Sequence, residues 1–219
     1  MRHTWEAVDH YFEAATGASD AVLSAALRAA SDAGLPPIHV SPLQGRLLTL
    51  LAQLRGASSI LEVGTLAAYS TICLARGMAP LGRLTTLELD PRHASVARGN
   101  LAAAGLLNRV TLIEGPAISS MRTLHAQGHR IDLAFIDADK AGIPEYFDLA
   151  VRMALPGAVL IVDNAVRDGK VLDVSGQDPS VEGVRRFAAS LASDRRVIST
   201  TLQTVGVKGY DGFTIALVA

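Results

Sequence analysis

The chain has 219 residues, 49% of them hydrophobic, and its 20 Lys and Arg residues nearly balance its 21 Asp and Glu residues. This balance gives no electrostatic reason to expect a nucleic acid or a membrane surface as a partner. No apolar run reaches transmembrane length, no signal-peptide pattern is visible, and the lone Cys73 excludes an intrachain disulfide framework. We therefore expect a single soluble domain, residues 1–219, in the cytoplasm.

The expected elements alternate between helices and short β-branched strands. Residues 4–54 predict helices broken near "GLPPIHVSP", so that 1–54 forms an N-terminal helical part and 55–219 an α/β core. In the core, strands are expected at 59–63, 83–88, 109–114, 131–136, 158–162, 197–204 and 213–218. Helices are expected to begin near Tyr69 and to cover 91–104, 119–127, 143–153 and 181–193.

The order of these elements indicates the fold class. Strands that are apolar on both faces and alternate with helices are typical of a parallel sheet covered on both sides. The last two strands have no helix between them and are joined by the loop "TVGVKGYDG", which predicts a hairpin with an antiparallel last strand. We expect an α/β fold with a seven-stranded, mostly parallel sheet, helices on both faces and extra N-terminal helices.

Two of the expected strands end in polar side chains. "RIDLAFIDADK" places Asp137, Asp139 and Lys140 after one strand, and "AVLIVDN" places Asp163 and Asn164 at the end of the next. Ligands of an open parallel sheet bind outside the carboxyl ends of its strands, and neighbouring strands lie about 4.8 Å apart. Two carboxylates and one amide oxygen form a set that suits a hard cation such as Mg²⁺. The alternative is that each acid caps the helix that follows it.

The first strand predicts a second binding region. In "SSILEVGTLAAYSTICLA" a strand ends at Glu62 and Gly64, and amides at the following helix start suit a carboxylate or phosphate. Glu88 ends the second strand, where an acid commonly binds ribose hydroxyls. The turn lacks G-x-G-x-x-G, and the chain has no G-x-x-x-x-G-K-[ST]. A nucleoside without a diphosphate is therefore favoured over NAD or ATP.

Several pieces together carry a family resemblance. "ILEVGT", "YST", "TLELDPRHASVARGNLAAAGL", "EGPA", "FIDADK", "VDN" and "DGFTIAL" occur in this order between about residues 40 and 219. In this order and spacing they resemble the cation-dependent, S-adenosylmethionine (SAM) dependent O-methyltransferases of the catechol and caffeoyl-CoA type. The resemblance implies a Rossmann-like class I methyltransferase sheet, SAM and Mg²⁺ or another divalent cation in adjacent halves of one cleft, and a homodimer.

The same resemblance implies roles for individual residues. Asp137, Asp163 and Asn164 match the metal ligands, and Lys140 matches the general base, although it could instead only pair with Asp137 or Asp139. Asp139 matches the cofactor side or is a solvated acid at a helix start. Family members usually carry glycine where this chain has Ala67 and Ala68. The positions implied to contact SAM are Val40, Glu62, Gly64, Thr65, Ser70, Glu88, Ala117 and, on the metal side, Asp137.

The expected reaction transfers a methyl group to one hydroxyl of a vicinal-dihydroxy aromatic. Chelation of both hydroxyls by Mg²⁺ favours ionisation of a phenol whose ordinary pKa is about 10, and Lys140 takes the proton. A caffeoyl ester, a free catechol and an antibiotic precursor all remain open as acceptors. The segment 165–180 lacks the bulk expected for gripping a CoA tail, so a small hydroxylated aromatic is favoured.

Other functions and other residues fit less well. A short-chain dehydrogenase would need Tyr-x-x-x-Lys, which the chain lacks, and a non-catalytic SAM-binding module would need none of the metal set or Lys140. The six histidines show no metal-ligand spacing, and Cys73 is expected in the core. Tyr210 and Asp211 are candidates for the acceptor-pocket wall. The N-terminal aromatic residues are expected to pack, with a dimer interface or a lid as alternatives; they are Trp5, Tyr11 and Phe12.

Overall fold

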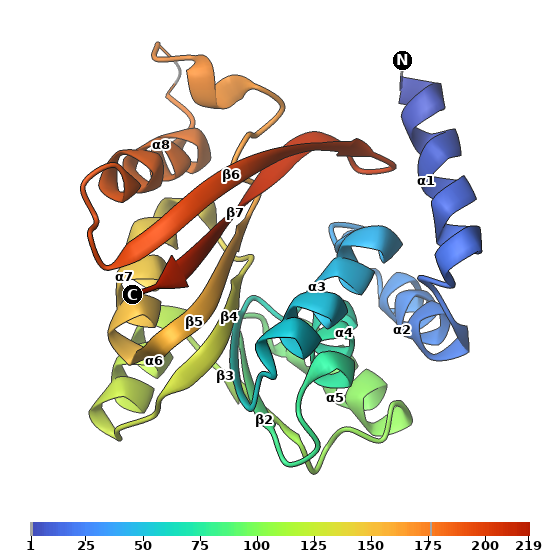
Figure 1. Cartoon of the computed structure of the whole chain (residues 1–219). Coiled ribbons are helices and arrows are strands. Elements are labelled where there is room, and N and C mark those ends of the chain that lie inside the picture. The colour runs from blue at the N-terminus through green and yellow to red at the C-terminus, as the bar shows by residue number, and fades with distance from the viewer. Residues whose placement is uncertain (1, 176) are drawn as a thin grey trace.

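The structure, a computed structural model, describes residues 2–175 and 177–219 of the chain (Figure 1). Its centre is a seven-stranded sheet in the order β3-β2-β1-β4-β5-β7-β6. Strand β7 is antiparallel to both of its neighbours, and the other strand pairs are parallel. The strands are β1 (Ser59–Val63), β2 (Arg83–Glu88), β3 (Val110–Glu114), β4 (Ile131–Ile136), β5 (Ala154–Asp163), β6 (Val197–Gly206) and β7 (Gly209–Val218).

Helices cover both faces of the sheet (Figure 1). One face packs against α6 (Ala117–Ala126), α7 (Ile143–Met153) and α8 (Pro179–Leu191). The other face packs against α2 (Ala21–Asp32), α3 (Pro42–Arg55), α4 (Tyr69–Gly77) and α5 (Pro91–Ala103). Helix α1 (Arg2–Thr16) buries no residue, and short 3₁₀ helices occupy Lys140–Gly142 and Lys170–Leu172.

The sequence explains the two buried faces of the sheet. Along β4, Leu133 and Phe135 pack toward α3 and α4, whereas Ala134 and Ile136 pack toward α6 and α7. Successive strand residues point to opposite faces, so burial on both sides requires a continuous apolar run. This burial confirms the fold class expected from the sequence. No helix within residues 2–175 and 177–219 is long and apolar enough to cross a membrane.

The register of the parallel strands brings the ends of four strands to one edge. Val63 of β1 pairs with Leu87 of β2 and with Ile136 of β4, and Ile136 pairs with Val162 of β5. The residues that follow these pairs therefore emerge side by side above the sheet. This alignment confirms that the strands ending at Ile136 and Val162 are neighbours.

The main correction to the expected elements concerns the hairpin. The stretch "TVGVKGYDG" is mostly strand, because β6 extends to Gly206 and β7 begins at Gly209, leaving only Val207 and Lys208 between them. Gly209 has a φ of +90°, a conformation that favours glycine and permits so short a reversal. Most of the expected loop is therefore strand that continues into a tight turn. Strand β5 also begins earlier than expected, at Ala154.

Candidate active site

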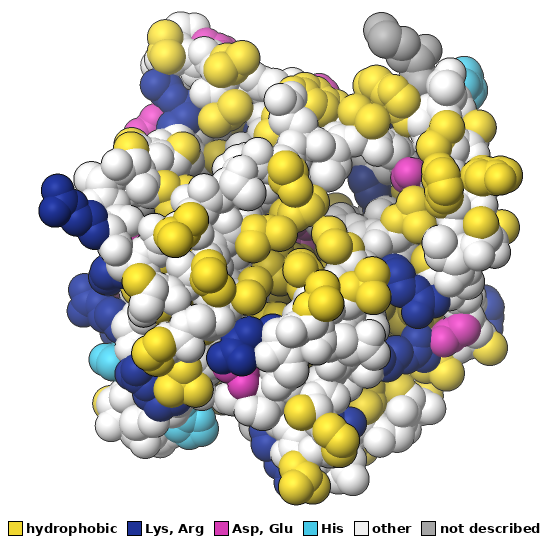
Figure 2. Space-filling model, in the orientation of Figure 1, with side chains coloured by type: hydrophobic (Ala, Val, Ile, Leu, Met, Phe, Trp, Pro, Cys, Tyr) yellow, Lys and Arg dark blue, Asp and Glu magenta, His cyan; other side chains and the backbone are white. Residues whose placement is uncertain are grey.

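A cavity of about 1020 Å³ lies at the carboxyl ends of the parallel strands. Its wall also includes residues of α3, of the loop before α3 and of the β6–β7 hairpin, and Figure 2 shows the surface opening beside the hairpin tip. The cavity brings together most of the residues that the sequence analysis selected. They are Val40, Gly64, Thr65, Ser70, Glu88, Ala117, Asp137, Asp139, Lys140, Asp163, Asn164 and Asp211.

Gly64 sits where the ends of β1 and β4 approach each other. Its φ is +98°, and a Cβ added there would lie 2.1 Å from the backbone oxygen of Asp137. The backbone N–H of Asp137 donates to the Val63 oxygen over 2.8 Å. No residue with a side chain fits this position without moving β4, so the glycine fixes how the two halves of the cavity meet.

Glu62 of β1 is fully buried and is not among the described residues that line the cavity. The hydroxyls of Thr71 and Thr86 donate to its Oε2, whereas its Oε1 has no hydrogen-bond partner among the residues that the structure describes. Burial raises the pKa of Glu62 to about 7, against the neighbouring hydroxyls, which lower it. An unpaired buried oxygen of this kind fits a cationic group of a ligand such as the amino group of SAM.

Glu88, at the end of β2, binds the turn that follows β1. Its Oε2 accepts the backbone N–H groups of Thr65 and Leu66 over 3.1 and 2.8 Å, and its Oε1 accepts that of Asp90 over 2.9 Å. His93 Nδ1 lies 3.5 Å from Oε1. The carboxylate therefore orders the turn and also forms part of the cavity wall.

Helix α4 begins at the turn that contains Ala67 and Ala68, where the sequence resemblance implied glycine. Ala68 has a φ of +65°, in the left-handed region, and supplies no side-chain cap for the helix. Ala67 is buried, and its carbonyl accepts a hydrogen bond from Asn100 Nδ2 over 2.9 Å. A left-handed alanine is strained by about 1–2 kcal/mol relative to glycine. Ala68 therefore occupies a backbone conformation that favours glycine.

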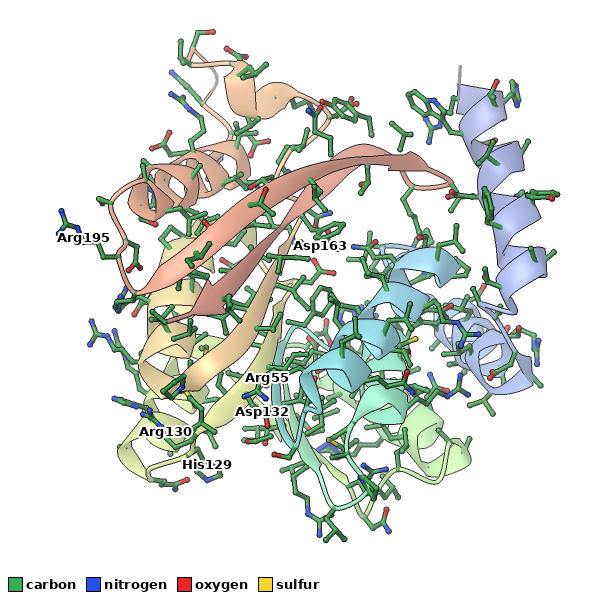
Figure 3. The ribbon with its side chains drawn as sticks, in the orientation of Figure 1. Arg55, His129, Arg130, Asp132, Asp163 and Arg195 are labelled. Carbon is green, nitrogen blue, oxygen red and sulfur yellow. The ribbon has the colours of Figure 1, made fainter. Side chains whose placement is uncertain are left out.

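The other half of the cavity contains the expected cation ligands. Asp163 is buried at the end of β5, and Gln44 Nε2 of α3 donates to its Oδ2 over 2.8 Å. In Figure 3 Asp163 lies at the upper end of the sheet, beside α3. Burial, and then the negative charge of Asp137, raise the pKa of Asp163 well above its usual range. A buried carboxylate whose ionisation a neighbouring carboxylate opposes is suited to share a cation with that neighbour.

Lys140 and Asp139 take separate partners. Lys140 Nζ lies 2.7 Å from Asp137 Oδ1 and is largely buried. Asp139 accepts hydrogen bonds from the backbone N–H of Gly142 and from the Tyr146 hydroxyl, so it caps the first 3₁₀ helix while also lining the cavity. Both of the roles considered for Asp139 are thus compatible with its position.

Asn164 leaves β5 in the left-handed conformation, with a φ of +58°. Its Nδ2 donates to Asp211 Oδ2 over 3.2 Å. Asp211 lines the cavity, as considered from the sequence, whereas Tyr210 is not among the described residues of the wall and its hydroxyl donates to Gln203.

Sequence reasoning missed several contributors to the site. Gln44 comes from a helix 119 residues before its partner Asp163, and no motif marked it. Thr71 and Thr86 became visible only once β1, β2 and α4 were assembled. His39 also lines the cavity, and burial, followed by the charge of Lys208, lowers its pKa to about 4. Only its place beside the cavity, after a proline-rich break, could have drawn attention to it.

The donor set can be compared with what a metal and SAM require. Among residues 2–175 and 177–219, no group of three His, Cys, Asp or Glu side chains is placed to hold a metal. The set at the ends of β4 and β5 instead combines two carboxylates with an amide, which is an all-oxygen set of the type that Mg²⁺ prefers. On the other side, the unpaired Glu62 oxygen and the uncapped α4 start fit the charged ends of an amino acid.

Comparison with known proteins agrees with this geometry. Residues 14–217 match the family model of the O-methyltransferases. A catechol O-methyltransferase from Niastella koreensis is 49% identical over 98% of this chain and 97% of its own length. A catechol O-methyltransferase from Mycobacterium tuberculosis is 45% identical over 96% of this chain and 94% of its own.

Solved structures agree as well. The O-methyltransferase from Bacillus cereus in complex with SAH matches with a TM-score of 0.98 and 46% identity over 100% of both chains. TomG from Streptomyces achromogenes, an O-methyltransferase of tomaymycin synthesis in complex with SAM, matches with a TM-score of 0.96 and 46% identity over 100% of this chain and 98% of its own. The chain therefore belongs to the O-methyltransferase family, and the protein is a SAM-dependent O-methyltransferase.

Proposed function

We propose that this O-methyltransferase requires Mg²⁺ or another divalent cation and methylates one hydroxyl of a small catechol-type aromatic. The observation that carries the proposal is the convergence of Asp137, Asp163 and Asn164 at neighbouring strand ends, where burial and Asp137 oppose ionisation of Asp163. The two relatives named catechol O-methyltransferase support the choice of acceptor.

Each half of the cavity then has its own task. Glu62 and the α4 start bind the methionine part of SAM, with Gly64, Thr65 and Ser70 beside it, and Glu88 binds the ribose. Val40 and Ala117 line the remaining cofactor wall. Asp137, Asp163 and Asn164 hold the cation. Since SAM and the acceptor occupy adjacent halves of one cavity, positioning alone supplies much of the rate enhancement.

The chemistry needs a deprotonated acceptor oxygen. A bound divalent cation would hold both vicinal hydroxyls and favour ionisation of one of them. Lys140 accepts that proton as its neutral amine. A divalent cation on the Asp137 carboxylate would compete with the Lys140 side chain for that carboxylate. The acceptor oxygen then forms a bond to the methyl carbon while the carbon–sulfur bond breaks and its electrons pass to sulfur.

The cavity favours a small acceptor. Its volume of about 1020 Å³ has to hold SAM together with the acceptor, whereas a site for one drug-sized ligand occupies about 300–1,000 Å³. A CoA ester is the alternative acceptor. The ratio of kcat/KM for caffeic acid and its CoA thioester distinguishes the two, and we expect the free acid to be preferred.

Chelation is the direct test of the cation. Excess EDTA should abolish methyl transfer to a simple catechol, and Mg²⁺ should restore it. Asp163→Ala should also abolish transfer, because the remaining carboxylate neutralises the cation poorly, while calorimetry should show that SAM still binds. Full activity in EDTA, with no metal found by elemental analysis, would reduce these acids to structural caps.

Lys140→Ala separates the base from the metal site. Cation binding should persist, the rate near neutral pH should fall, and higher pH should recover part of it because the acceptor ionises unaided. A variant with an unchanged rate would leave Lys140 only its ion pair with Asp137.

A further inference from the structure

We propose that Asp211 is the positioning residue that turns the amide of Asn164 so that its oxygen faces the cation; this inference rests on the metal site proposed above. Asp211 belongs to β7, the antiparallel strand beside β5. Its carboxylate reaches across to the segment that follows β5, and it lies in the wall of the same cavity as Asp137 and Asp163.

One carboxylate takes four hydrogen bonds at this place. Asp211 Oδ1 accepts the backbone N–H groups of Val166, Arg167 and Gly212 over 3.0, 2.8 and 2.9 Å. Its Oδ2 accepts Nδ2 of Asn164 over 3.2 Å. Asp211 therefore fixes the backbone after β5 with one oxygen and the Asn164 side chain with the other.

The chemistry of a carboxylate decides which way the amide points. The Asp211 carboxylate offers only acceptor oxygens to its neighbours, so the Asn164 edge that faces it is the donating NH₂. The amide oxygen then points to the opposite side, and the backbone amides held by Oδ1 keep the carboxylate from rotating away. An amide has similar shape in both orientations, so without such a partner it could present NH₂ to a cation, which is repulsive.

The backbone around Asn164 needs the same support. Asn164, Arg167 and Asp168 all have a φ between +56° and +58°, in the region that favours glycine. Asparagine and aspartate tolerate this conformation better than most residues. The hydrogen bonds from Val166 and Arg167 to Asp211 hold this strained segment. The backbone that follows Asn164 and the orientation of the Asn164 amide therefore both depend on Asp211.

Asp211→Asn tests the orientation with almost no change in shape. The introduced asparagine keeps an oxygen for the three backbone N–H groups but turns its NH₂ toward Asn164, which has to flip and offer its own NH₂ to the cation. We expect Mg²⁺ affinity, measured by calorimetry in SAM-saturated protein, to fall about 10- to 100-fold, the usual effect of losing a partner of a metal ligand. SAM affinity should stay within a few-fold of wild type, which also reports that the variant folds.

A second variant exchanges donor and acceptor. In the double variant Asn164→Asp/Asp211→Asn, the carboxylate now stands at position 164 and the amide at position 211. The carboxylate accepts a hydrogen bond from the amide NH₂ with one oxygen and offers its other oxygen to the cation. Mg²⁺ affinity should return to near the wild-type value, whereas Asn164→Asp alone should not bind as tightly as the double variant, because two carboxylates then face each other.

Asp132→Asn is the matched control. Asp132 also accepts backbone N–H groups, those of Ser58 and Ser59, but lies at the opposite end of the sheet from Asp163 (Figure 3). This change should lower stability and leave Mg²⁺ affinity unchanged.

Three results would overturn the inference. Wild-type Mg²⁺ affinity in Asp211→Asn would make Asp211 a turn cap only. Failure of the double variant to regain affinity would mean that the charge of Asp211, and not the amide orientation, matters. Absence of Mg²⁺ binding in the wild-type protein would remove the metal site itself, and with it both proposals.

Discussion

At the residue scale, the surroundings of Glu62 oppose the ionisation of its carboxyl group. It is fully buried, and burial raises its pKa to about 7 from an ordinary value near 4.5. The unfolded chain releases this proton at lower pH than the folded chain does. The free energy of unfolding of the ligand-free protein should therefore decrease as the pH rises from about 4.5 to about 7. Above about pH 7, Glu62 should cause no further decrease.

Cofactor binding should reverse the preference of Glu62. The amino group of SAM is cationic and favours the carboxylate, so binding below pH 7 has to expel a proton. Between pH 8 and pH 5.5 we expect SAM affinity to fall about thirtyfold for a group with this pKa. Calorimetry at both pH values measures the fall. Glu62→Gln should bind SAM weakly at both, and an equally steep fall in that variant would assign the titration to another group.

At the element scale, the start of α4 shows a backbone in conflict with its residue. Ala68 is left-handed, whereas Ala67 has no positive φ. Ala68→Gly should relieve about 1–2 kcal/mol of strain and lose about 0.4–1 kcal/mol through the more flexible unfolded chain. The net gain should raise Tm by a few degrees. SAM affinity should stay similar or rise.

Ala67→Gly is the neighbouring control for this prediction. It removes a buried methyl group and adds backbone freedom without relieving strain, so it should destabilise the protein by about 0.5–1 kcal/mol. Equal losses from both substitutions, in thermal or denaturant unfolding, would show that the alanines serve helix stability instead.

The elements that sequence predicted best are those whose pattern reports burial directly. Strands β1, β2 and β4 have the bounds that the sequence predicted, and most of their residues are buried because both faces of the sheet are covered there. The bounds of β6 could not be predicted in this way. Eight of its ten residues are exposed, so the strand shows no alternation of buried and exposed side chains. Its extension into the hairpin depends on pairing with β7, which local composition does not encode.

The site divides along the same line. Side chains that follow a strand end, such as Asp137, Asp163 and Glu88, were placed from the sequence because strand ends define the cleft. Gln44 and the contacts of Asp211 were not, because they join segments far apart in the chain. Hydrogen bonds between distant segments depend on the assembled sheet and leave no periodic signal.

At the scale of the whole molecule, one apolar surface has no cover within the described chain. Ile198 of β6 pairs with Leu217 of β7, and Leu202 lies on the same sheet face; all three are exposed. Leu50 and Leu54 of α3 are exposed as well. Figure 2 shows hydrophobic side chains gathered over the hairpin and beside it. Monomers rarely leave such surfaces in water, and a long exposed edge strand also invites pairing.

The homodimer implied by the sequence resemblance fits this surface, and it remains a prediction. Leu202→Lys should convert a dimer to a monomer in sedimentation or light-scattering measurements, because it buries a charge between the subunits. Leu81→Lys is the control, since Leu81 is 92% exposed and lies before β2, away from the hairpin. A dimeric Leu202→Lys variant, or a monomeric wild type, would place the contact elsewhere or remove it.

The position of β7 also has a consequence for synthesis on the ribosome. In the chain β7 follows β6, but in the sheet it lies between β5 and β6. A nascent chain that has emerged only as far as Gly206 has six strands, yet β6 has no neighbour to pair with. It also lacks Asp211, so Asn164 has no partner for its amide. The turn after β1, together with β2 and α4, can form long before that point, whereas the proposed cation site waits for β7 to insert.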